Sequence, residues 1–318
     1  MDASAAFIST VPILQSPAWA AVQRALGRTV HERSGDGWQY LAIVERGRLG
    51  SRLYTPLGPA VSSVEALGAA VADLRALAAD AGVDFLRIEP TAPIVAADVE
   101  ALGGFRAART VQPDCTVIND VTMSEDDIAA AFGSSARRNW RNGLKKGLEV
   151  EHSTRPEDVE ILLSHLADVA ARTGMHPHSP DYFRTVSRVL LEEGAGGYII
   201  VRHEGEPVGS LLYYQANQQM MFAHSASLTS ARSLNPTYAL AAEALMLSHR
   251  LGDRLFDFCG AAPEGAPESH PWFGFTDFKL RFGGERVMRA GTWEIPIRAM
   301  RHRAYRLALR VDSLRPGH

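Results

Sequence analysis

The stretch Pro271-Trp272-Phe273-Gly274-Phe275-Thr276-Asp277-Phe278-Lys279-Leu280-Arg281-Phe282-Gly283-Gly284 follows a strand-like run, Arg254-Leu255-Phe256-Asp257-Phe258-Cys259. A helical period places Lys279 beside an apolar stripe instead of opposite it. Two interpretations stand: a short core helix whose lysine extends to water, or a cation fixed at the end of a strand, where α/β folds bind ligands. The residues of the predicted stripe are Phe275, Phe278 and Phe282.

Composition indicates a globular protein with room for two domains. The chain has 318 residues, 46% of them hydrophobic and 22% charged, and a formal charge of −3. Cys115 and Cys259 stand far apart without a CxxC pair, so neither a disulfide framework nor a structural zinc site is indicated. Met1–Pro12 lacks the pattern of a signal peptide, and a reducing cytoplasm is expected, with a peripheral membrane contact left open.

A strand pair, a helix and a strand occur twice. Asp84–Glu89 corresponds to Arg254–Phe258 at a separation of about 170 residues. We therefore predict a duplicated α/β (α+β) architecture in which each copy is a sheet flanked by helices. The first domain is expected over residues 1–133, with 287–318 as a potential completion, and the second over 134–286. The last segment is predicted to hold a strand at Val287–Ile295 and a helix at Ile297–Leu314 with an apolar side at Ile297, Met300, Ala304, Leu307 and Val311.

A basic segment opens the second domain. Five positive residues and no acid lie between Arg137 and Lys146. On a helix, Arg137, Arg141 and Lys145 align at intervals of four residues, with Arg138 beside them, and such like charges repel one another. A solvated face normally interleaves acids, so phosphate or polyanion binding is favoured over a plain surface helix. Trp140 is either a stacking platform or the anchor of this helix in the core.

Several polar residues of the second copy are candidates for a site. Asp257 alternates with two strand phenylalanines and could hold an amine or pair with a cation. Tyr238 stands in the first turn of a capped helix, and Ser210 and Tyr214 share one strand face. Met175-His176-Pro177-His178 has no acid or cysteine partner, so no metal is expected. Cys259 is either a nucleophile or an inert thiol.

The order of these segments resembles the Fem-type aminoacyltransferases, which add amino acids from aminoacyl-tRNA to peptidoglycan precursors. The residues that carry the resemblance are Arg137–Arg141, Lys145–Val150, Leu234-Asn235-Pro236, Phe256–Gly260, His270-Pro271 and Phe278–Gly284 in the second half, and Leu86–Pro90 and Gly104-Phe105 in the first. The resemblance implies two tandem GNAT-like domains, each a mixed sheet flanked by helices. This chain shows no helical hairpin of the kind that many relatives insert for tRNA.

The resemblance also implies residue roles. The Phe-Lys pair of the family falls on Phe278 and Lys279, with Lys279 assisting the reacting ester or the tRNA end. Tyr238 is expected to contact the acceptor, together with Ser210, Tyr214 and Arg281, and Asp257 to orient its amine. For tRNA or phosphate, the expected residues are Arg137, Arg138, Arg141 and Lys145.

The implied function is transfer of an amino acid from aminoacyl-tRNA to the amine of a peptide acceptor, either a peptidoglycan precursor or a peptide natural-product intermediate. It requires no cofactor, because the ester is already activated. One alternative is a CoA-dependent GNAT N-acyltransferase, which Leu228–Pro236 disfavours since it has no glycine and a proline removes one amide donor. A second is a non-catalytic module that binds RNA or anions.

Overall fold

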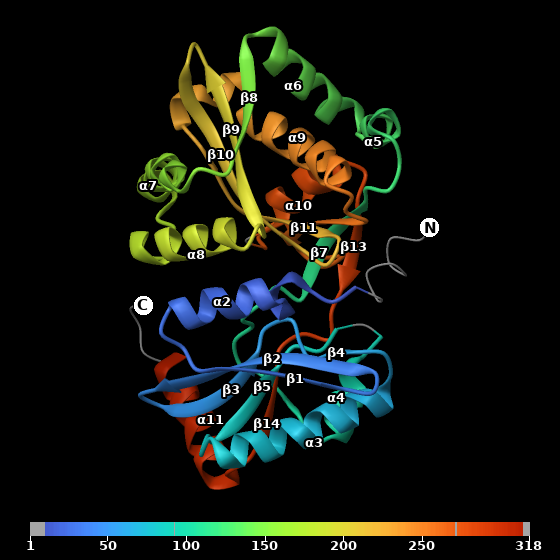
Figure 1. The fold of residues 1–318 in the computed structure, drawn as a ribbon, viewed down its shortest axis with the longest axis vertical. Coiled ribbons are helices and arrows are strands. Elements are labelled where there is room, and N and C mark those ends of the chain that lie inside the picture. Colours follow the sequence, from blue (N-terminus) through green and yellow to red (C-terminus); the bar gives the residue numbers. More distant parts are fainter. Residues whose placement is uncertain (1–9, 92, 271, 314–318) are drawn as a thin grey trace. The chain divides into compact units, whose positions relative to one another are not determined.

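The computed structural model describes residues 10–91, 93–270 and 272–313, which form two α/β units (Figure 1). The C-terminal unit comprises residues 10–13 and Cys115–Val287, and the N-terminal unit comprises Leu14–Asp114 and residues 288–313. The expected boundary at 133/134 therefore lies inside the C-terminal unit, because Cys115–Asp120 already pairs with its sheet. Residues 1–9, Pro271 and Leu314, on which some expectations rest, lie outside the described residues.

The N-terminal unit is built on a sheet of order β1-β2-β3-β5-β14-β6, with β4 paired to β2. Strands β3 and β5 are parallel, whereas β14 runs antiparallel to β5. The C-terminal segment thus completes this sheet. The strands are β1 (Val30–Gly35), β2 (Trp38–Gly47), β3 (Gly50–Thr55), β4 (Ala60–Val61), β5 (Phe85–Ile88), β6 (Phe105–Arg106) and β14 (Trp293–Pro296). The helices are η1 (Ile13–Gln15), α2 (Pro17–Ala25), α3 (Val64–Asp80), α4 (Ala96–Ala101) and α11 (Ala299–Ser313).

The prediction of one strand over Val287–Ile295 is wrong. The segment contains the end of β13 (Glu285–Met288) and the start of β14, which belong to different sheets. Gly291 between them adopts φ +84°, a left-handed conformation that glycine reaches without a Cβ clash and that interrupts an extended run. The segment predicted as one strand therefore connects the sheet of one unit to the sheet of the other.

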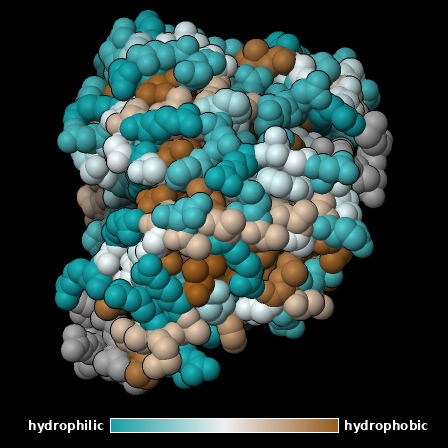
Figure 2. Space-filling view, turned by 60° about the horizontal axis from the view of Figure 1, so that its bottom comes forward, coloured by the Kyte–Doolittle hydropathy of each residue, from teal (hydrophilic) through white to brown (hydrophobic). Residues whose placement is uncertain are grey.

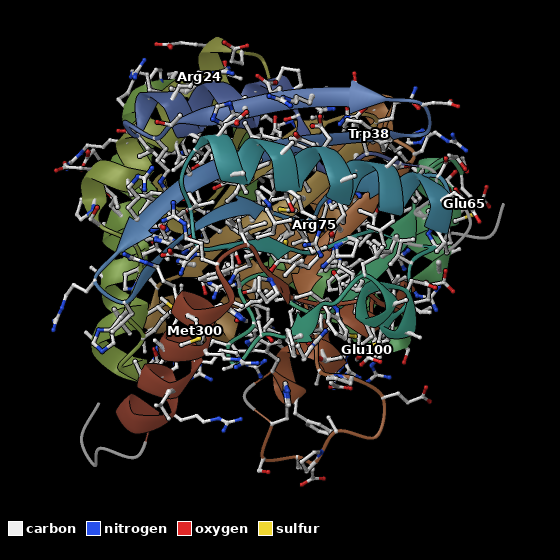
Figure 3. The ribbon with its side chains drawn as sticks, turned by 90° about the horizontal axis from the view of Figure 1, so that it is seen from below. Arg24, Trp38, Glu65, Arg75, Glu100 and Met300 are labelled. Carbon is white, nitrogen blue, oxygen red and sulfur yellow. The ribbon has the colours of Figure 1, made fainter. Side chains whose placement is uncertain are left out.

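Helix α3 covers one face of the N-terminal sheet. Ser63 caps it by accepting a hydrogen bond from Ala66 N at 3.2 Å. Its apolar positions, such as Leu67 and Leu74, are fully buried against Leu86 and Ile295. Glu65 and Arg75 lie on the same helix (Figure 3), and Arg75 Nη2 donates to Leu102 O at 2.9 Å. This face is an apolar core with its charges kept outside.

The opposite face of the same sheet holds a buried polar network. Arg87 on β5 donates to Glu294 on β14 and, at 2.7 Å, to the hydroxyl of Tyr305 on α11. His302 Nε2 lies 3.0 Å from the second oxygen of Glu294. Burial alone would raise the pKa of Glu294, but the hydrogen bonds from His302 and Arg87 lower it overall. The network fixes α11 to the sheet.

The C-terminal unit is built on a sheet of order β13-β7-β12-β11-β10-β9-β8. Its strands are β7 (Cys115–Asp120), β8 (Leu148–Ser153), β9 (Gly196–His203), β10 (Glu206–Ala216), β11 (Gln219–Ser227), β12 (Leu255–Gly260) and β13. Its helices are α5 (Glu125–Ala131), α6 (Ser134–Lys145), η2 (Pro156–Asp158), α7 (Val159–Thr173), α8 (Pro180–Glu192), η3 (Thr229–Leu234), α9 (Pro236–Arg250) and α10 (Phe273–Leu280).

Helix α9 is the central helix of this unit. Asn235 precedes it with φ +58°, and Pro236 occupies its first position, where a missing N–H costs nothing. Its buried residues pack with Phe256 and Phe258 of β12 in the main core. Helices α7 and α8 lie on the other side of β9 and β10 from α9 (Figure 1).

The two units repeat one topology, which confirms the predicted duplication. In each, two antiparallel strands lead into a helix and then into a strand parallel to the second of the pair. The correspondence is β3–α3–β5 in the N-terminal unit and β11–α9–β12 in the C-terminal unit. In the described part of the chain, no helix combines the length and apolarity needed to cross a membrane.

We predict that Glu294→Ala lowers the free energy of unfolding by roughly 3 to 5 kcal/mol, because it leaves the buried Arg87 guanidinium without its carboxylate. Chemical denaturation monitored by circular dichroism measures the change. Glu100→Ala on α4 is the matched control: this carboxylate is exposed (Figure 3), and its removal is expected to change stability by less than about 0.5 kcal/mol. Equal stability of the two variants would contradict the prediction.

Candidate active site

The candidate site lies where two parallel strands separate. β11 and β12 pair only at Gln219–Met221 with Leu255–Asp257. Beyond these three pairs β11 continues to Ser227 beside β10, and β12 continues to Gly260. We call the segments 222–227 and 258–260 the strand fork. Backbone groups on the facing edges of the fork form no ladder with each other, and ligands bind to α/β folds at such carboxyl ends of strands.

Asp257 is buried at the β12 arm of the fork and forms hydrogen bonds that stabilise it. Its side chain is 1% exposed, and its Oδ1 accepts hydrogen bonds from the Thr116 hydroxyl and, at 2.7 Å, from Cys259 N. Cys259 adopts φ +59°, which is uncommon for a residue other than glycine. The register with β7 shifts at the same place, between Asp257 and Gly260. Asp257 therefore holds the strand end in a strained turn.

Lys279 on α10 reaches the same strand end. Its Nζ donates to Cys259 O at 3.0 Å and to Gly260 O. Burial lowers the pKa of Lys279, although Cys259 and Asp257 counteract part of that effect. An ammonium has three N–H donors, so these two bonds leave one for a ligand. The structure thus places a half-buried cation at the fork, as the second interpretation of the sequence expected.

Two aromatic residues stand beside Lys279. Phe278 meets Tyr238, in the first turn of α9, edge to face at 5.1 Å between ring centroids. Both rings also contact Phe282, which is completely buried. The predicted three-phenylalanine stripe is wrong for Phe275, which is 64% exposed. In the first turn of α10 the buried residue is Thr276, whose hydroxyl accepts from Ala262 N at 2.7 Å, and the neighbouring Phe275 points away from the core.

Arg281 lies at the surface, on the α6 side of α10. It forms an ion pair with Asp277, which raises its pKa, and its Nη1 is 3.4 Å from Ser135 Oγ. Its own carbonyl accepts from Gly133 N at 2.8 Å. Arg281 therefore joins α10 to the start of α6 instead of lining the fork.

Ser210 and Tyr214 share a strand face as predicted, but helices cover that face. Ser210 is fully buried, and its hydroxyl lies 2.8 Å from His165 Nδ1 of α7. His165 Nε2 must donate to Pro207 O, at 3.0 Å, because a carbonyl only accepts; Nδ1 therefore accepts from Ser210. Ser210 is therefore buried between β10 and α7.

Tyr214 belongs to an aromatic and imidazole cluster that the sequence reasoning missed. Its hydroxyl is 3.0 Å from His224 Nε2 on the β11 arm of the fork. Burial, with His178 as a second cause, lowers the pKa of His224 to about 4, so this imidazole is neutral at physiological pH. His178 stacks on Tyr182 at 4.1 Å. The sequence did not indicate this cluster, because His224 is a single histidine in a strand and some of its aromatic neighbours come from α8, which is distant in sequence.

The basic residues of α6 remain available for an anion. Arg138, Arg141 and Lys145 are exposed, and no described residue forms a hydrogen bond or ion pair with them. Arg137 differs, since its Nη1 donates to Ala130 O at 3.3 Å. Trp140 anchors the helix by packing on Phe132 at 5.8 Å, which favours its core interpretation over base stacking.

Helix α6 lies close to the segment that leads into α9. A Cβ on Gly143 would be 3.0 Å from Leu234 O and 2.8 Å from Leu148 Cδ1, so only glycine allows this approach. Lys146 Nζ donates to Ser233 O at 3.1 Å. The basic face therefore adjoins the N-terminus of α9, where Tyr238 meets Phe278. Within residues 10–91, 93–270 and 272–313, no three His, Cys, Asp or Glu side chains gather into a group that could hold a metal ion.

Changing Cys259 tests whether its thiol or only its backbone matters. We predict that Cys259→Gly stays within about 1 kcal/mol of the parent stability, because glycine accepts φ +59° without strain but loses more entropy on folding. Cys259→Val is expected to lose about 1 to 3 kcal/mol. Thermal unfolding measures both. Comparable destabilisation by glycine and valine would show that the side chain, not the backbone angle, decides stability here.

Comparisons with known proteins concern the fold and the sequence of the C-terminal unit. The family model described as an acetyltransferase (GNAT) domain matches residues 132–274. A lipid II:glycine glycyltransferase of Staphylococcus epidermidis is 29% identical over 98 residues, 31% of this chain and 23% of that protein. One of Staphylococcus haemolyticus is 27% identical over 136 residues, 41% of this chain and 30% of that protein. The matches thus span about a quarter to a third of these relatives.

Solved structures match nearly the whole chain. The crystal structure of FemX superposes with a TM-score of 0.83 at 16% identity, covering 94% of this chain and 96% of that one. A tandem GNAT protein from the clavulanic acid biosynthesis pathway gives a TM-score of 0.56 at 16% identity, covering 93% and 92%. This chain therefore has the tandem fold of FemX, and its C-terminal unit is similar in sequence to the acetyltransferase (GNAT) domain.

Proposed function

We propose that this protein is an acyltransferase that moves an amino acid from aminoacyl-tRNA to the amine of a peptidoglycan precursor, forming a peptide bond. The observation that carries the proposal is the ammonium of Lys279, held by two backbone carbonyls at the strand fork. The similarity to lipid II:glycine glycyltransferases supports a cell-wall acceptor. A peptide natural-product intermediate offers the same amine and is the alternative acceptor.

The chemistry needs positioning and charge stabilisation more than a nucleophilic side chain. The acceptor nitrogen attacks the ester carbonyl, so the N–C bond forms while the carbonyl oxygen becomes negative. The third N–H of Lys279 would donate to that oxygen, a contact that strengthens as charge develops. The ester C–O bond then breaks, and the proton lost by the amine ends on the ribose hydroxyl of the tRNA.

The surrounding residues would orient the two substrates. Asp257 keeps the two carbonyls aimed at Lys279 through its bond to Cys259 N. The rings of Tyr238 and Phe278 flank the lysine and could hold the acceptor or the terminal base. Arg138, Arg141 and Lys145 would bind phosphates of the acceptor arm on the neighbouring α6.

Transfer from acetyl-CoA fits the same fold less well. CoA enzymes of this type bind pyrophosphate with backbone N–H groups ahead of the central helix. Here the carboxylate of Asp168 accepts from Thr229 N at 3.0 Å and from its hydroxyl at 2.6 Å. The hydroxyl and backbone N–H of Thr229 lower the pKa of Asp168, so a negative charge stands where pyrophosphate would bind. A non-catalytic module that binds RNA would not explain why the ammonium of Lys279 is held at the strand fork.

Replacing the lysine tests the proposal. Lys279→Ala is expected to slow transfer at least about tenfold, which corresponds to about 1.4 kcal/mol on the barrier. The assay incubates the protein with a radiolabelled aminoacyl-tRNA pool and candidate peptide amines, and in parallel with labelled acetyl-CoA. Phe275→Ala, an exposed neighbour on α10, is the control and should retain the parent rate. Unchanged transfer in a folded Lys279→Ala variant removes this residue from the site, and acetyl transfer alone would replace the proposed donor.

Charge reversal on α6 tests the nucleic-acid partner. Arg137→Glu with Arg138→Glu should weaken tRNA binding and make it less sensitive to salt, because each lost phosphate contact reduces the slope of log K against log salt by about 0.7 to 0.9. Filter binding across a salt series measures the slope. Arg184→Glu with Arg188→Glu on α8, where both arginines already form ion pairs, is the matched control. Identical slopes for both double variants would indicate that α6 is an ordinary surface helix that does not bind tRNA.

A further inference from the structure

Helix α11 presents its apolar side outward. Sequence periodicity predicts a buried stripe that includes Met300, Ala304 and Leu307, yet all three are exposed, Met300 by 77% and Leu307 by 63%. The side that packs on the sheet instead carries His302 and Tyr305, whose rings lie 5.1 and 4.8 Å from Phe85. The predicted packing is therefore wrong, because the residues that bind Arg87 and Glu294 occupy the inner face of the helix. Met300 lies on this helix in Figure 3.

The same surface is strongly basic. Five arginines and no acid occur between Arg298 and Arg310. The side chain of Arg301 is 71% exposed and that of Arg298 49%, and their nearest carboxylate, at 3.8 and 3.7 Å, is the buried Asp84. Burial alone would raise the pKa of Asp84, but hydrogen bonds from Ser51 and these arginines lower it, so it offsets one positive charge. The net charge of the helix remains positive.

A third apolar residue extends the surface beyond the helix. Phe105 on β6 is 47% exposed, and the guanidinium of Arg306 lies over its ring at 5.1 Å from the centroid. The space-filling view shows tan and brown atoms next to teal ones at its lower left, on the side where Figure 3 shows α11 (Figure 2). Large apolar side chains and guanidinium groups thus share one surface, which we call the α11 surface: Phe105, Met300, Leu307 and the arginines at 298, 301, 303 and 306.

We infer that the α11 surface docks the protein on an anionic lipid bilayer, with Met300, Leu307 and Phe105 entering the region between headgroups and acyl chains. Arginines at the edge of such a helix meet lipid phosphates while their methylene stems cover apolar surface. RNA would use the arginines alone and would leave the three apolar side chains in water. Docking does not depend on the proposed transfer reaction, although it would bring the chain to a lipid-linked acceptor.

Vesicle flotation of the full chain tests the inference. The protein should float with vesicles of phosphatidylglycerol and phosphatidylcholine in equal parts, and should stay in the dense fraction with phosphatidylcholine alone. Binding should fall as salt rises, since only the electrostatic part is screened. Absence of flotation with anionic vesicles at low salt would overturn the proposal.

Two double variants separate the apolar and charged contributions. Met300→Ser with Leu307→Ser, and Arg301→Glu with Arg303→Glu, are each expected to lower vesicle partitioning by about tenfold or more. The control carries the same charge reversal on the α3 side of the sheet, Arg46→Glu with Arg75→Glu, each of which donates to a backbone carbonyl, and should partition like the parent. Circular dichroism and thermal unfolding verify that each variant is folded.

The outcomes discriminate between partners. Loss of partitioning in both α11 variants but not in the control supports a lipid surface. Undiminished partitioning of the serine variant would overturn the proposal, because the apolar residues would then contribute nothing. Loss of tRNA binding in the glutamate variant, without any vesicle binding by the parent, would assign the α11 surface to RNA instead.

Discussion

The strand fork of the C-terminal unit depends on one buried carboxylate. Asp257 binds the Thr116 hydroxyl and the backbone N–H of Cys259, and so bends the end of β12 away from the direction of its ladder. Two consecutive carbonyls, those of Cys259 and Gly260, then point at one ammonium. Without this turn, β12 would continue beside β11 as an ordinary parallel strand, and Lys279 would lose the acceptors that hold it. The site is thus an interruption of sheet pairing that side chains stabilise.

The N-terminal unit uses the same topology for a different purpose. Its corresponding strands β3 and β5 pair through four residues, and the next strand, β14, comes from the far end of the chain. The buried face beside β14 is occupied by the Arg87–Glu294 ion pair with Tyr305 and His302. Such a network is costly to disrupt, since Glu294 is bound by both Arg87 and His302, and Tyr305 also accepts from Arg87. Duplication therefore produced one copy with a fork and one with a buried polar network.

The two basic helices of the chain differ in what accompanies their charge. On α6 the tryptophan packs inward on Phe132, so the outer face carries guanidinium and ammonium groups suited to a polyanion. On α11 the inner face is polar, and Met300 and Leu307 are displaced outward among the arginines. Similar composition thus yields two surfaces, one suited to phosphate chains and the other to a boundary between phosphate and hydrocarbon.

The sequence by itself determined the duplicated order of strands and helices and the position of Lys279 beside an apolar stripe. These features follow from local periodicity, which depends on residues a few positions apart. The resemblance of its motifs to Fem-type proteins also pointed to the correct fold. Only the tertiary structure decided which faces are covered: Ser210 lies beneath α7, Phe275 lies outside the core, and the apolar side of α11 faces outward. It also split the segment around Gly291 between two sheets and joined Asp257, Cys259 and Lys279 at one strand end. These outcomes depend on contacts between residues tens to hundreds of positions apart, for which local patterns carry no signal.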